Sequence, residues 1–108
     1  MKPLNEEVEL LKIFDMLKKL YPSMKTPELY DVVFEDSFHH MGRCWTDSGS
    51  IGISLSCHGE ISSKNKEFVN TVVHELVHLN FPAMEHGEEF YTLVNCILNK
   101  VFSKLTES

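Results

Sequence analysis

The stretch VVHELVHLN, residues 72–80, places ionisable side chains inside an apolar run. His74 and His78 are four residues apart, about one turn of an α-helix, so their imidazoles project from the same face. Both rings can then reach one metal ion at about 2.0–2.1 Å, and the carboxylate of Glu75 can reach a water on that ion. The sequence therefore predicts an H-E-x-x-H metal site on a helix.

A catalytic zinc site also needs a third protein ligand and an open position for water. His86 follows His78 beyond a proline-containing turn, near the predicted start of the next helix. Because helices joined by a short turn pack against each other, we expect His86 to approach the metal. Glu88 and Glu89 are competing ligands, although acidic residues are also favoured in the first turn of a helix. We predict one catalytic Zn²⁺ held by His74, His78 and His86.

The composition is that of a single globular domain spanning residues 1–108, with 43% hydrophobic and 24% charged residues. No apolar run approaches the roughly 20 residues that cross a bilayer. The first residues, MKPLNEEVELLKIF, lack the features of a signal peptide. Three cysteines do not form a disulfide framework, so we expect a cytoplasmic protein. The net charge of −6 does not support binding to nucleic acid.

The pattern of apolar residues predicts an α+β domain: an N-terminal helix, a three-stranded, mainly antiparallel sheet, a central helix that carries the metal motif, and a C-terminal helix. The expected elements are a helix over 5–21, strands over 30–36, 39–45 and 51–56, a helix that ends before Pro82, and a helix from about 85–87 to 104.

Two local features refine this prediction. In SIGISLSC, isoleucine and leucine alternate with glycine and serine, which is typical of a half-buried strand, here expected at an edge of the sheet. Ser62 or Ser63 is the expected cap of the central helix.

The cysteines raise the question of a second metal site. Cys44, Cys57 and His58 do not make a four-ligand set, and the chain has no C-x-x-C pair, so we do not predict one. We expect Cys96, in the last helix, to be a small buried hydrophobic residue.

The motif VVHELVHLNF…EHGEEF, with GRCW…IGISLS upstream, resembles the SprT-like metalloprotease domain, the class that includes the Spartan protease. The resemblance covers roughly residues 28–94 and implies a zinc-dependent protease, which in the best-known members acts on proteins crosslinked to DNA. The chain shows no zinc ribbon or basic tail, and its acidic charge does not support DNA association. The residues that match the family's ligands, base and H-G-x-x-F pattern are His74, Glu75, His78, His86, Gly87 and Phe90.

The expected reaction is hydrolysis of protein or peptide substrates by a monomer, with Glu75 as general base. Tyr91, His39 and His40 are the candidates for stabilising the oxyanion. A free edge of the strand over 51–56 could bind an extended substrate, and Ser54→Pro would then impair cleavage. Two alternatives stay open: a non-catalytic, zinc-stabilised interaction module, and a latent, self-inhibited protease resembling minimal gluzincins.

Overall fold

The computed structural model describes residues 5–35, 42–54 and 60–107. It confirms an α+β fold of three helices and a three-stranded sheet. None of the described helices is long and apolar enough to span a membrane. In chain order the elements are α1 (Asn5–Leu20), a short 3₁₀ helix η1 (Leu29–Asp31), β1 (Val32–Glu35), β2 (Gly42–Trp45), β3 (Ser50–Ser54), α2 (Lys66–Asn80) and α3 (Glu88–Leu105).

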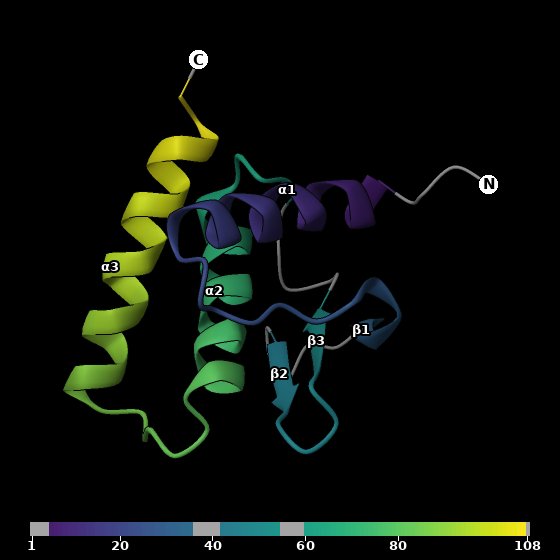
Figure 1. Ribbon diagram of the computed structural model, residues 1–108. Coiled ribbons are helices and arrows are strands. Elements are labelled where there is room, and N and C mark those ends of the chain that lie inside the picture. Colours follow the sequence, from purple (N-terminus) through teal and green to yellow (C-terminus); the bar gives the residue numbers. More distant parts are fainter. Residues whose placement is uncertain (1–4, 36–41, 55–59, 108) are drawn as a thin grey trace.

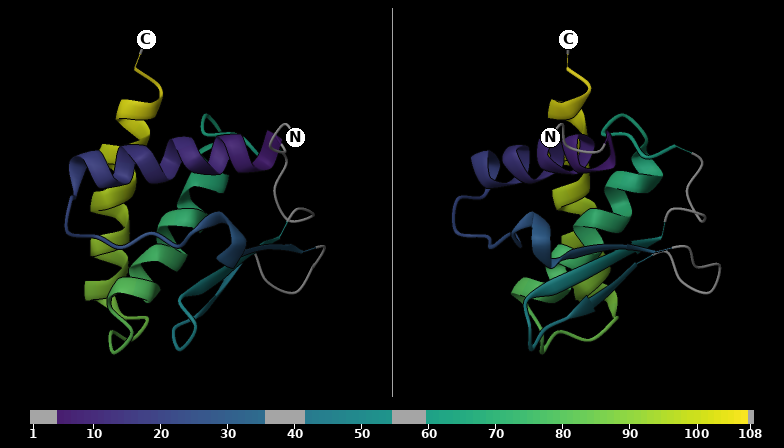
Figure 2. Two further views of the ribbon diagram at one scale, coloured as in Figure 1. Left: turned by 45° about the vertical axis from the view of Figure 1, so that its right-hand side comes forward. Right: turned by 90° about the vertical axis from the view of Figure 1, so that its right-hand side faces the viewer.

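The central helix α2 lies between α3 on one side and the sheet on the other, and α1 crosses one end of this arrangement (Figure 1 and Figure 2). The α2–α3 turn and the β2–β3 hairpin lie together at the opposite end. Because α2 is covered on two sides, apolar residues occupy most of its circumference. Its fully buried apolar side chains are Phe68, Val69, Val72, Val73, Leu76 and Val77.

The sheet has the strand order β1-β3-β2. β2 and β3 are antiparallel, as expected for a hairpin, whereas β1 runs parallel to β3, so the sheet is mixed rather than mainly antiparallel. The expectation that the strand over 51–56 lies at an edge is wrong, because β3 is the central strand. Ser54→Pro would therefore disrupt the middle of the sheet and cannot test substrate binding.

Both faces of β3 are buried, in contrast to the half-buried strand that its alternation indicated. Ile51 and Ile53 face α2, and Ser54 on the other face is also fully buried. A Cβ added to Gly52 would lie 2.8 Å from the carboxylate of Glu35 and 3.0 Å from the ring of Trp45. The large side chains of the neighbouring strands therefore close over the small residues of β3.

The start of α2 differs from the prediction. Asn65, not Ser62 or Ser63, caps the helix, and its side chain accepts a hydrogen bond from the Glu67 N–H at 3.1 Å. Ser63 instead donates from its N–H and hydroxyl to the carboxylate of Glu9 at 2.9 and 3.1 Å. This contact fastens the beginning of α1 to the segment before α2.

The outer helices each bury one face. In α3 the buried residues form a stripe from Phe90 to Val101, but Cys96 is exposed, so the expectation of a buried cysteine is wrong. In α1 the buried stripe runs through Leu10 and Leu17, whereas the neighbouring Leu11 is 37% exposed.

Asn80, at the end of α2, holds the segment that follows α1. Its Oδ1 accepts from the Lys25 N–H at 2.7 Å, and its Nδ2 donates to the Lys25 carbonyl at 3.0 Å. We expect Asn80→Ala to lower the free energy of unfolding by about 1–2 kcal/mol, since each such bond contributes about 1 kcal/mol net. Asn95→Ala, on the exposed side of α3, is the control in chemical denaturation, and equal losses in both variants would contradict this role.

Candidate metal centre

The structure brings together the three histidines that the sequence predicts as ligands. One ring nitrogen from each of His74, His78 and His86 lies within 4.8 Å of the other two. The ring centroid of His74 lies 4.9 Å from that of His78 and 5.2 Å from that of His86. The Nε2 atoms of His78 and His86 face each other. The competing ligands Glu88 and Glu89 are not part of this group.

Two elements position these rings. His74 and His78 stand one turn apart on α2 and are partly buried, whereas His86 is exposed in the turn just before α3. The turn reverses the chain within a few residues, and Gly87 adopts an extended conformation as the cap of α3. His86 therefore reaches back over the last turn of α2 as the spacing predicted.

The side chain of Phe90 is fully buried beneath the three imidazoles. Its ring centroid lies 4.9, 4.5 and 4.9 Å from those of His74, His78 and His86. An aromatic ring that packs at these distances restricts the orientation of each imidazole. Phe90 is thus the apolar floor of the site, a role that its position in the H-G-x-x-F pattern did not predict.

The environment favours the neutral form of the two imidazoles on α2. Burial, followed by the neighbouring histidines His78 and His86, lowers the pKa of His74 to about 4. Burial and then His86 lower the pKa of His78. Because a metal binds neutral imidazole, these two rings are in the ligating form at neutral pH. Three converging imidazole nitrogens are a donor set that fits a divalent transition metal such as zinc.

Glu75 lies beside this cluster and is 5% exposed. Burial raises the pKa of its carboxyl group to about 7. The chain makes room for it at Gly42 of β2, where an added Cβ would come within 3.0 Å of Cγ and Oε2 of Glu75 and 2.9 Å of Cγ2 of Thr71. Only a residue without a side chain permits β2 to approach α2 this closely.

The site opens into a cleft between α2, β2 and the α2–α3 turn. The three histidines and Glu75 line a cavity of about 310 Å³. A neighbouring cavity of about 250 Å³ is also lined by His74, Glu75 and Gly42. The short strand β2 forms one wall of this cleft, and no pattern in the sequence indicates this. The residues that line the larger cavity besides the histidines and Glu75 are Gly42, Arg43, Cys44, Thr46 and Pro82.

The remaining candidate residues have different positions. Tyr91 is 49% exposed, and its ring lies 6.0 Å from that of His86 and 6.2 Å from that of His74. Cys44 lines the cleft, and burial, followed by the charge of Glu75, raises the pKa of its thiol to about 11. His39, His40, Cys57 and His58 lie outside the described residues.

The position of Phe90 leads to a first prediction for this site. Phe90→Leu keeps an apolar residue but removes the ring surface that the three imidazoles share, so we expect zinc affinity to fall about tenfold. Phe102→Leu, at the other end of α3, is the matched control and should leave the affinity unchanged. Competition with a chromophoric chelator measures both, and equal affinities of the two variants would contradict the role of Phe90.

The buried carboxyl group leads to a second prediction. The ordinary pKa of a glutamate is 4.5, and burial raises that of Glu75 to about 7. In metal-free protein, the free energy of unfolding therefore falls as the pH rises through this range, because the buried carboxyl group resists losing its proton. Glu75→Gln removes this cost, so the variant should gain about 3 kcal/mol of unfolding free energy over the wild type at pH 8 relative to pH 4.5. His74 titrates in both proteins, so its contribution cancels in the difference. Glu67→Gln, which changes an exposed carboxylate of α2, should show no such gain in denaturation measured with EDTA present.

Comparisons with protein-family models, with curated proteins and with solved structures found no match for the chain. The resemblance to SprT-like metalloproteases therefore stays a prediction that rests on the sequence motifs. The arrangement of the described residues, three converging imidazoles beside a buried carboxylate in an open cleft, is the basis on which a function can be proposed.

Proposed function

We propose that the chain is a zinc-dependent endopeptidase of the SprT-like class. The observation that carries the proposal is the buried carboxylate of Glu75, which shares one cleft with the three imidazoles. A site that only stabilises a fold is normally closed by four protein ligands and has no use for a carboxylate beside it. Here the described residues supply three converging nitrogens and leave the cleft side accessible.

His74, His78 and His86 would hold the zinc ion, which when bound polarises a carbonyl group and makes water acidic enough to lose a proton near neutral pH. Three neutral imidazoles do not reduce the double charge of the ion, so its effect on water is strong. The preference for zinc over other divalent transition metals is part of the proposal, since imidazole ligands suit several of them.

Glu75 would move the proton during peptide hydrolysis. Its carboxylate takes a proton from the attacking water while the water oxygen bonds to the scissile carbonyl carbon. It then gives that proton to the amide nitrogen, and the carbon–nitrogen bond breaks to leave a carboxylate and an amine. The close approach of Gly42 leaves room for the carboxylate beside the cleft, where both transfers would take place. Tyr91 is the described candidate for stabilising the oxyanion, from its position beside His86.

The substrate would lie along β2. This strand lies at an edge of the sheet and lines the cleft, so it can pair with an extended peptide by β-addition. It takes the place of the strand over 51–56, which is central. The proposal includes a monomer that acts in the cytoplasm on protein or peptide substrates, in keeping with the free thiols of Cys44 and Cys96.

Metal content and cleavage of unfolded β-casein test the proposal together. The wild type should bind one zinc ion and cleave the substrate. Glu75→Gln should keep the zinc but lose at least about a hundredfold in rate, the usual contribution of a general base. His86→Ala should lose zinc affinity. Glu67→Gln and the double variant Glu88→Gln/Glu89→Gln are controls that should change neither property.

The two alternatives give different results. A wild type that binds zinc and cleaves neither casein nor itself, even after truncation from either end, is an interaction module and contradicts the proposal. Activity that appears only after truncation identifies a latent protease. Addition of duplex DNA tests the family's association with DNA, and the net charge of −6 predicts no stimulation.

A further inference from the structure

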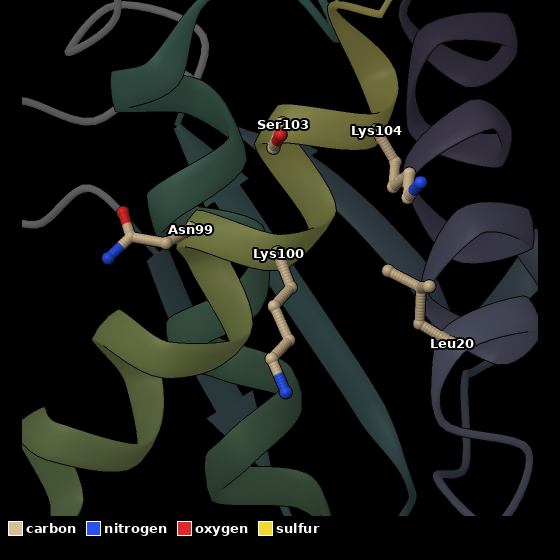
Figure 3. Close-up of a pocket in the computed structure, with 5 residues that line it drawn as sticks. All are labelled: Leu20, Asn99, Lys100, Ser103 and Lys104. Atoms are coloured by element: carbon tan, nitrogen blue, oxygen red, sulfur yellow. The ribbon is translucent and has the colours of Figure 1, made fainter.

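A groove runs between α1 and α3 at the end of the molecule away from the histidines (Figure 3). Leu20 of α1 and Lys104 of α3 point into the gap between the two helices. The first hollow has a volume of about 340 Å³, and two adjoining hollows of about 400 and 470 Å³ share Lys104 with it. We call these three hollows together the α1–α3 groove.

Each helix contributes one stripe of its surface to the α1–α3 groove. On α1 the lining includes Lys12, Met16 and Lys19, and on α3 it includes Lys100 and Lys104. These residues recur at intervals of three and four, so each set lies along one side of its helix. Because α1 crosses α3 (Figure 1 and Figure 2), the groove is bounded by one face of each helix on either side of their crossing.

The floor of the groove is apolar. Met16, Leu20 and Leu105 line it, and all three are partly buried and packed against the hydrophobic core. A row of accessible apolar side chains between two polar rims is the usual form of a surface that receives the apolar face of another helix.

The rims of the groove carry the opposite charge to the rest of the protein. Five of the ten basic residues line it, with two carboxylates, Asp15 and Glu107, so the lining has a charge of +3 in a chain of net charge −6. The basic residues are Lys12, Lys19, Lys64, Lys100 and Lys104.

Lys12 already pairs with Glu9 at 2.7 Å, and the other four lysines are available to a partner. Within the described part of the chain, Lys19, Lys64 and Lys100 form no ion pair. Lys100 Nζ lies over the ring of Tyr21, 6.0 Å from its centroid, a weak contact that a carboxylate can replace. Lys104 pairs with Glu107 at 3.3 Å, but both side chains are more than half exposed. Exposed pairs of this kind contribute little to stability and exchange readily for a better partner.

We propose that the α1–α3 groove binds an acidic amphipathic helix of a partner protein. The apolar floor takes the apolar stripe of such a helix, and its carboxylates pair with the lysines on both rims. A nucleic acid would satisfy the lysines but would leave the apolar floor without a complementary surface. The proposal goes beyond the peptidase function, because it does not depend on the chemistry of the histidines.

The position of the groove leaves the histidine cleft open. Phe90, at the metal centre, and Lys104, in the groove, are separated along α3 by about 21 Å, from a rise of about 1.5 Å per residue. A helix bound in the groove would therefore fix the protein to a partner without covering the cleft.

The test uses fluorescence anisotropy with a labelled, Glu-rich peptide of about 18 residues whose leucines recur at intervals of three and four. We expect this peptide to bind the full chain, and a scrambled peptide of the same composition to bind at least about fivefold more weakly. The double variant Lys19→Glu/Lys104→Glu should weaken binding at least about tenfold. Lys18→Glu/Lys66→Glu carries the same change in charge on exposed lysines outside the groove and should change binding less than about twofold.

Circular dichroism of both double variants establishes that they are folded before binding is compared. Equal losses in the two variants, equal binding of the two peptides, or no binding of the amphipathic peptide would each overturn the proposal. A labelled duplex of about 20 base pairs that binds more tightly than the peptide, with the same dependence on Lys19 and Lys104, would assign the groove to nucleic acid instead.

Discussion

Phe90 packs against all three candidate ligands at centroid distances of 4.5–4.9 Å, and the geometry of the centre depends on this contact. His74 and His78 belong to one rigid helix, so their relative position is set by the helical repeat. His86 has no such constraint, because it is exposed in a turn. Burial of the Phe90 ring between α2 and α3 fixes where α3 begins, and so places His86 opposite the other two rings.

A second constraint acts on Glu75. Removing a carboxyl group from water is costly, and burial raises its pKa to about 7. The fold nevertheless holds β2 against α2 at this point, where Gly42 has no side chain to keep them apart. A residue that destabilises the metal-free protein in this way is more readily explained by a role in chemistry than by a role in the fold.

The parts of the site that depend on local geometry could be predicted from the sequence. His74 and His78 belong to one helix, so their spacing in the sequence fixes their relative position. The turn that brings His86 back to them is only a few residues long, so its effect is also local. The strand order could not be predicted, because pairing of β1 with β3 is a long-range contact with no local signal. The burial of both faces of β3 could not be predicted either. Its alternating pattern suggested one solvent-exposed face, but side chains from the two neighbouring strands cover Gly52.

The wrong prediction of the cap of α2 also has its origin in a long-range contact. Ser63 is a good capping residue by type, but Glu9 of α1, distant in sequence, accepts its hydrogen bonds. The cap passes to Asn65, which has no such competitor among its described partners. Tertiary contacts therefore decide between residues of equal local preference. A different tertiary contact, between Gly42 of β2 and Glu75 of α2, forms the cleft wall, and no helical or strand pattern indicated it.

The two surfaces that we assign to ligands lie at opposite ends of α3. Its first turn provides the aromatic floor of the metal centre, and its last turns form one rim of the α1–α3 groove. A ligand that binds only the folded state stabilises it by mass action. Zinc at the histidines and a helix in the groove would both hold α3 against its neighbours, one through α2 and the other through α1. Each should therefore raise the free energy of unfolding by itself, and because the sites share no residue, the two increments should add.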